Sequence, residues 1–99
     1  MRIALRSHGI ELLDPDNFTA FDVLAPAQDD EEVIAALGKA GAASSEPGHA
    51  LISVSSVREL ADPIDDAWEE QFQTMLRFAE SRGWLDDSGE WITAHVCGT

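Results

Sequence analysis

His95 and Cys97 carry chemically versatile side chains and stand two positions apart in "ITAHVC". Imidazole and thiolate both ligate zinc, and a third ligand from His8 or His49 would complete a catalytic-type set. The pair could also act as nucleophile and base, but nothing in the sequence identifies a third group to orient the histidine. Because a single His-x-Cys lacks the paired ligands of a structural zinc site, we expect no metal and no cofactor. We interpret Cys97 as a small apolar residue of a strand.

A strand that runs through "EWITAHVC" would give these two side chains a common face. Alternate side chains of a strand point to opposite sides, so His95 and Cys97 would point away from Ile92 and the other apolar residues. The apolar set belongs against helices, and the opposite face of the sheet is then open. The candidate binding or interface residues on this open face are Arg6, His8, His49, Leu51, Trp91 and His95.

The first quarter of the chain predicts two strands. Residues 2–13 alternate but change parity at Gly9, which indicates one strand with a bulge. Residues 18–25 alternate as well and are followed by Pro26, which would end a second strand. A short helix from Asp16 is the competing interpretation of this segment.

The middle of the chain predicts a helix, a linker-like segment and a third strand. Residues 27–41 have acidic residues at the start and apolar residues at helical spacing, and Gly41 could close the helix. Gly, Ser and Pro cluster over residues 41–49. Residues 49–56 alternate again, and a helical turn capped by Ser55 or Ser56 would follow.

The strongest pattern lies in residues 62–84. Asp62 could cap a helix whose first residue is Pro63, and Gly83 is placed as a left-handed residue after it. Trp84 would then fold back onto Phe78 and its neighbour. The expected buried stripe consists of Ile64, Trp68, Phe72, Met75, Leu76 and Ala79.

Together these elements predict an α+β fold in the order ββαβαβ. We expect a two-layer sandwich in which two helices cover one face of a four-stranded sheet. A length of 99 residues and 44% hydrophobic residues predict a single domain over 1–99. One cysteine cannot form an internal disulfide, and no apolar run is long enough for a membrane span, so we expect a cytoplasmic protein.

The net charge of −13 limits the classes of partner. Six scattered basic residues make no patch for a phosphate backbone, so we expect no nucleic acid and no membrane as partner. One interpretation of the carboxylates is a solvated surface that keeps the protein soluble, and the other is a mimic of nucleic acid or a partner for a basic protein. Both remain open at this point.

The open face suggests two functions from different classes. Large apolar patches are rare on monomers, so the first hypothesis is a small accessory protein that pairs with itself or with a protein partner through this face. The alternative is a small-molecule enzyme with a pocket there, in which Arg6 holds an anion and a histidine acts as general acid or base. The apolar members of the expected face are Ala4, Phe18, Ala20, Leu24, Leu51 and Trp91.

Overall fold

The computed structural model describes residues 1–6, 9–25, 30–44, 46 and 48–97, and within these ranges the chain forms an α+β fold with one mixed sheet. The order across the sheet is β2-β1-β3-β6-β5-β4. β1 is parallel to β3 and β3 to β6, whereas the other neighbours are antiparallel. The strands are β1 (Arg2–Arg6), β2 (Gly9–Leu13), β3 (Asp22–Leu24), β4 (Gly41–Ala43), β5 (His49–Ser53) and β6 (Trp91–Cys97).

The described residues contain three α-helices and one short 3-10 helix. These are α1 (Asp30–Leu37), η1 (Gly38–Ala40), α2 (Val54–Ala61) and α3 (Asp66–Ser81). The expected sandwich of four strands and two helices in the order ββαβαβ is therefore wrong, since the sheet has six strands and a third helix joins the fold. None of the helices in the described ranges is long and apolar enough to cross a membrane.

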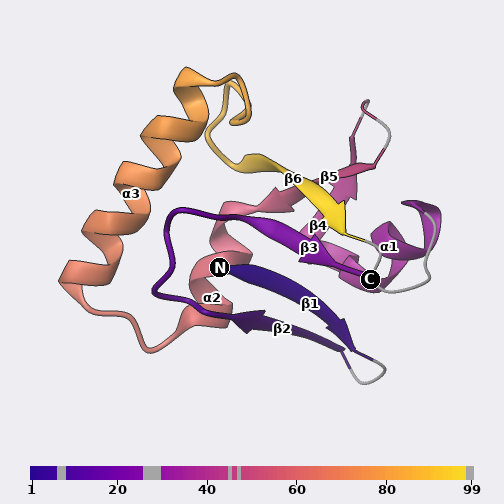
Figure 1. The fold of residues 1–99 in the computed structure, drawn as a ribbon, viewed down its shortest axis with the longest axis horizontal. Coiled ribbons are helices and arrows are strands. Elements are labelled where there is room, and N and C mark those ends of the chain that lie inside the picture. The colour runs from indigo at the N-terminus through magenta and orange to yellow at the C-terminus, as the bar shows by residue number, and fades with distance from the viewer. Residues whose placement is uncertain (7–8, 26–29, 45, 47, 98–99) are drawn as a thin grey trace.

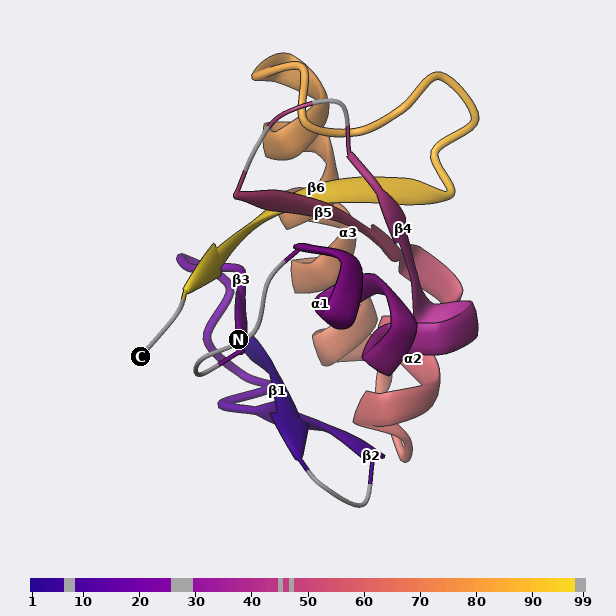
Figure 2. The same cartoon turned by 90° about the vertical axis from the view of Figure 1, so that its right-hand side faces the viewer.

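The sheet curls into a half-barrel instead of forming one flat layer (Figures 1 and 2). α1 contacts β1, β2, β4 and β5, and α2 contacts β2 and β5, so these two helices fill the concave side between the two sheet edges. α3 lies beyond the strand ends and covers one end of the half-barrel (Figure 1). The concave side is the core, and its buried members include Ile3, Val23, Val33, Ile52, Val57, Phe72 and Ile92.

The parity change at Gly9 comes from a hairpin and not from a bulge. β1 and β2 pair antiparallel with Leu5 opposite Ile10 and Ile3 opposite Leu12. A reversal of the chain shifts the inward positions from odd to even residues just as a bulge would. Alternation alone could not distinguish the two, because both conserve the side-chain pattern on the buried face.

The segment expected as a second strand is mostly irregular. Only Asp22–Leu24 form β3, and residues 18–20 are neither strand nor helix. The side chain of Asn17 accepts hydrogen bonds from the backbone N–H of Thr19 at 3.1 Å and from its hydroxyl at 2.7 Å. Such local side-chain bonds offer the backbone an alternative to the ladder, which shortens the strand.

The helix expected over residues 27–41 ends early. α1 stops at Leu37, Gly38 has a φ of 58° that favours glycine, and Gly41 starts the edge strand β4. A Cβ on Gly41 would lie 2.5 Å from Cδ1 of Leu37, so glycine is required there by close approach. The supposed linker therefore contains a strand.

The last two helices also begin elsewhere than expected. β5 ends at Ser53, whose hydroxyl accepts from the backbone N–H of Ser56 and caps α2, so Val54 is helical. α3 begins after Asp65, whose carboxylate accepts from the N–H of Trp68 at 2.8 Å. The observed N-caps are a serine and an aspartate, as expected, but they are Ser53 instead of Ser55 or Ser56, and Asp65 instead of Asp62.

Candidate functional site

A polar row crosses the outer, convex face of the sheet. The ladder places Arg2 opposite Asp22, Asp22 opposite His95, and His95 opposite His49. Nε of Arg2 lies 2.9 Å from Oδ1 of Asp22, and Nη2 donates to Oδ2 at 3.2 Å. The imidazoles of His49 and His95 meet edge to face with ring centroids 5.4 Å apart. The charge of Arg2 is thus matched by Asp22, and the two histidines stand beside that pair.

Cys97 lies next to this row. Its thiol is 3.6 Å from Oδ2 of Asp22, and its sulfur is 3.5 Å from Nδ1 of His95. Burial and the neighbouring carboxylate raise the pKa of the Cys97 thiol, so the thiolate is disfavoured. This arrangement is the opposite of an activated cysteine, in which a positive neighbour lowers the thiol pKa.

The row brings together some of the sequence candidates and leaves others apart. His49 and His95 are adjacent, and Leu51 and Trp91 are half-buried on the same outer face. His8 and the side chain of Arg6 lie outside what the structure describes. Among the described residues, no three His, Cys, Asp or Glu side chains are arranged to hold a metal ion.

The outer sheet face is less apolar than the sequence indicated. Ala4 is buried, and Phe18 packs edge to face on Trp68 of α3 with ring centroids 5.6 Å apart. The large hydrophobic side chains that the described chain exposes most are Phe78, at 52%, and Trp84, at 47%. Phe78 lies near the end of α3, and Trp84 lies in the loop after it, where its carbonyl accepts from the N–H of Thr93 of β6 at 2.7 Å.

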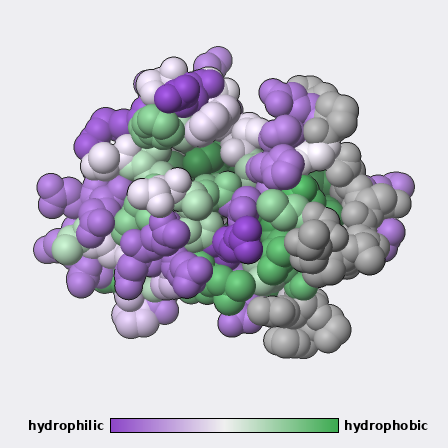
Figure 3. All heavy atoms as spheres, in the orientation of Figure 1, coloured by the Kyte–Doolittle hydropathy of each residue, from purple (hydrophilic) through white to green (hydrophobic). Residues whose placement is uncertain are grey.

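Phe78 and Trp84 belong to an apolar groove between α3 and residues 18–21. The groove begins in a hollow of about 540 Å³ beside α3, continues through a narrow space of about 90 Å³, and ends in a pocket of about 170 Å³ at the histidine pair. The first two spaces share Phe18 and Phe78, and the last two share Phe21 and Trp84. Apolar residues accordingly reach the surface among polar ones in the central part of this side of the molecule (Figure 3). We call this feature the aromatic groove; it is lined by Phe18, Thr19, Ala20, Phe21, Glu46, His49, Glu70, Gln71, Thr74, Met75, Phe78, Ala79, Trp84, Ile92, Thr93 and His95.

Specific contacts hold the two walls of the aromatic groove. The indole N–H of Trp68 donates to the carbonyl of Pro15 at 2.9 Å and ties the irregular segment to α3. Gly83 has a φ of 77°, which turns the chain so that the N–H of Trp84 bonds the carbonyl of Ala79 at 2.9 Å. Trp84 then meets Phe78 edge to face at 6.0 Å, as the glycine position predicted.

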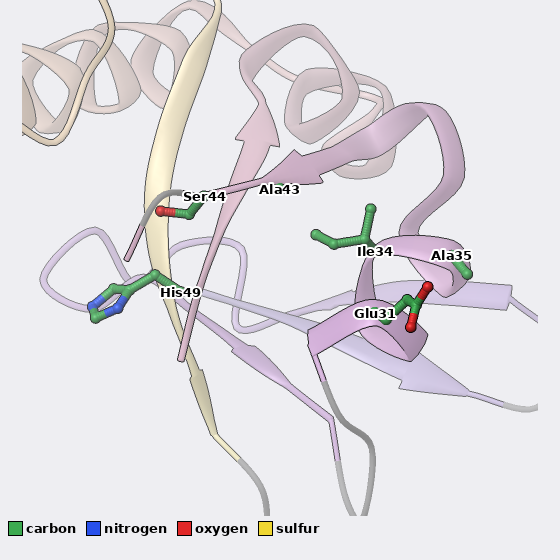
Figure 4. A pocket seen from close by; sticks show the side chains of 6 residues that line it. All are labelled: Glu31, Ile34, Ala35, Ala43, Ser44 and His49. Carbon is green, nitrogen blue, oxygen red and sulfur yellow. The ribbon is translucent and has the colours of Figure 1, made fainter. Parts of the chain in front are cut away.

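A second hollow, of about 460 Å³, lies between α1 and the β4 edge (Figure 4). His49 and Ser44 point away from α1 there, while Glu31 and Ala35 point away from the strands. Its polar side chains do not converge on a common point, as the groups of a ligand site do. This hollow therefore does not compete with the aromatic groove.

Comparisons of the chain with known protein families, curated proteins and solved structures find no match. The site is therefore interpreted from its geometry.

The groove was missed in the sequence for a physical reason. Glu70, Gln71, Thr74 and Phe78 follow helical spacing, one stripe beside the buried residues of α3. A helical stripe with only one aromatic residue does not indicate a binding surface in the sequence. The other wall of the groove comes from residues 18–21, whose alternation had predicted a strand. The one available signal was Gly83 followed by Trp84, which correctly placed the indole on Phe78.

Proposed function

We propose that the protein is a small acidic interaction protein that binds a basic, amphipathic segment of a protein partner in the aromatic groove. The observation that carries the proposal is the exposure of Phe78 and Trp84, side by side, in a groove bounded by carboxylates. Aromatic side chains that are fixed in place and open to solvent are the usual anchors of protein interfaces.

The groove has the form that an amphipathic segment requires. Phe18, Met75 and Phe78 line the part that would receive apolar side chains. Helix-in-groove recognition uses such apolar floors for residues at i, i+3, i+4 and i+7 of the bound helix. Because the indole of Trp68 bonds Pro15 and Phe18 packs on that indole, the floor is formed before binding and little ordering is needed.

Charge decides between a basic partner and a second copy. The chain carries 19 acidic and 6 basic residues, so two copies repel each other at low salt. Glu70 lines one end of the groove and Glu46 the other, and both are exposed. A basic segment is attracted by the same charges, which also accelerates its encounter with the groove.

The enzymatic alternative rests on the histidine pair. Their rings lie with centroids 5.4 Å apart, and histidine is a common general acid or base near neutral pH. However, the pocket beside them measures about 170 Å³, below the roughly 300–1,000 Å³ of small-molecule sites. Arg2, the arginine of the polar row, already forms an ion pair with Asp22 and does not offer its charge to a substrate anion. The geometry therefore supports binding of a side chain better than turnover of a substrate.

The proposal is tested with a synthetic helical peptide of leucine and lysine residues, labelled with a dye and titrated by fluorescence anisotropy. We expect saturable binding that weakens as salt rises, and no binding of the matching leucine–glutamate peptide. Phe78→Ala should weaken binding about tenfold or more, because it removes an exposed anchor. The matched control is Trp91→Leu, which changes an aromatic residue of the outer sheet face and should leave affinity unchanged.

Four results would overturn the proposal. The first is equal binding of the acidic and basic peptides, and the second is absence of binding to the folded chain. The third is a dimer in sedimentation that Phe78→Ala dissociates, since the groove would then hold a second copy. If Trp91→Leu abolished binding and Phe78→Ala did not, the outer sheet face would be the interface instead.

A further inference from the structure

We infer that the pocket at the histidine end of the aromatic groove receives one cationic side chain, lysine or arginine, of the bound segment; this inference rests on the proposed function. The pocket is lined by Phe21, Glu46, His49, Trp84, Thr93 and His95. We call it the cation pocket.

The size of the cation pocket favours one side chain. Its volume of about 170 Å³ is about half the lower limit for a typical small-molecule site. It also shares Phe21, Trp84 and Thr93 with the narrow part of the groove. A segment whose apolar residues occupy the groove could therefore extend a neighbouring side chain into it.

The walls of the cation pocket suit a positive charge. Trp84 and Phe21 supply aromatic rings, and tryptophan is the aromatic side chain that attracts cations most strongly. The carboxylate of Glu46 is 69% exposed and lies 3.9 Å from Nδ1 of His49, so one anionic group stands at the rim. No lysine or arginine is among the described residues that line the pocket.

The chain already makes a contact of this type on the same surface. The guanidinium of Arg82 lies 5.0 Å from the centroid of the Phe78 ring. Arg82 does not line the cation pocket, so this contact leaves the pocket itself to a ligand. Arg2, the arginine of the polar row, is likewise paired with Asp22.

The inference is tested by nuclear magnetic resonance on the ¹⁵N-labelled chain. The probe is Nα-acetyl-lysine methylamide, in which the ε-ammonium group keeps its charge. The uncharged N-acetyl-norleucine methylamide is its control. The indole N–H signal of Trp84, identified by its loss in Trp84→Phe, should shift saturably at millimolar lysine amide and remain in place with norleucine amide. Glu46→Gln should weaken the lysine effect several-fold. Its matched control Glu90→Gln, another exposed carboxylate outside this pocket, should not.

The inference would be overturned by equal shifts with both amides, or by no shift of the Trp84 indole at millimolar lysine amide. Equal weakening by the two glutamate variants would also overturn it, because the net charge alone would then explain the effect. If the leucine–lysine peptide bound with dependence on Phe78 while the lysine amide left Trp84 unchanged, the cation pocket would be refuted and the proposed function would stand. If the lysine amide acted on Trp84 but the peptide did not bind, the proposed function would be refuted instead.

Discussion

Phe72 and Phe78 stand on the same helix but have opposite surroundings. Phe72 is fully buried between Trp68, which stacks on it at 4.8 Å, and the guanidinium of Arg58, 5.1 Å from its ring centroid. Phe78 is about half exposed and contacts Trp84 and Arg82. The difference indicates that α3 has two stripes with different roles: a buried apolar stripe that closes the end of the half-barrel, and a mostly polar stripe that presents Phe78 to a partner.

The largest expected effect on stability comes from replacing the buried residue of the two, Phe72. Phe72→Ala should lower the free energy of unfolding by about 3–5 kcal/mol, because it leaves a cavity in the core. In a chain of 99 residues this is a large part of the total stability. Urea unfolding followed by circular dichroism measures the change. An unaltered midpoint would show that α3 does not close the core.

Trp68 connects the two sides, so its replacement should affect both. Trp68→Phe keeps an aromatic ring but removes the indole N–H that bonds the carbonyl of Pro15. We expect a loss of about 1–2 kcal/mol in unfolding free energy and weaker peptide binding, since residues 15–18 lose their tie to α3. If stability fell without any change in affinity, the groove wall would not depend on this bond.

A smaller effect is expected from the ion pair beside Phe72. Arg58 donates to both carboxylate oxygens of Glu69 at 2.9 and 2.8 Å, which holds the pKa of Glu69 below its usual value. The stabilisation of the folded state by this ion pair is therefore fully present above the ordinary glutamate pKa, and it is lost as the pH falls through the lowered pKa of Glu69 in the folded chain. Glu69→Gln should cost about 1 kcal/mol or less at neutral pH, because both side chains are about one-third exposed.

The pH dependence of unfolding separates this pair from general charge effects. The difference between the original chain and Glu69→Gln should vanish in acid, below the folded pKa of Glu69. Glu70→Gln is the control, since it changes the next residue by the same amount of charge. A difference that persisted in acid would assign the effect to packing instead of to the ion pair.

The smallest effect on stability is expected on the exposed side. Phe78→Ala should change the free energy of unfolding by about 1 kcal/mol or less, because half of the ring is already in water and no closed cavity is left. The same variant is expected to weaken peptide binding about tenfold or more. A destabilisation as large as that of Phe72→Ala would remove the distinction between the two stripes.

Short-range patterns in the sequence were sufficient for the local parts of the molecule. The alternation in "EWITAHVC" correctly placed His95 and Cys97 on the outer face, and Gly83 correctly indicated the turn that lays Trp84 on Phe78. The buried stripe of α3 was also correct for Trp68, Phe72 and Met75. Each of these features depends on contacts within one element or one turn.

The features that depend on distant segments could not be read in this way. The hairpin at Gly9 has the same alternation as a bulged strand, and β4 has only three small residues that carry no pattern. The aromatic groove needs Phe18, which looked like a strand residue, to meet α3 some 50 positions later in the sequence. Without a known strand order, nothing in the local pattern joins these two walls.

The central claim, that a basic segment binds in the aromatic groove and not on the part of the outer sheet face around Leu51 and Trp91, is tested most directly by titrating the ¹⁵N-labelled chain with the leucine–lysine peptide. The amide and indole signals that shift should be those of residues 18–21, Thr74, Phe78 and Trp84, which line the groove. Shifts concentrated instead at Leu51, Ser53 and Trp91, on the outer face of β5 and β6, would contradict the account.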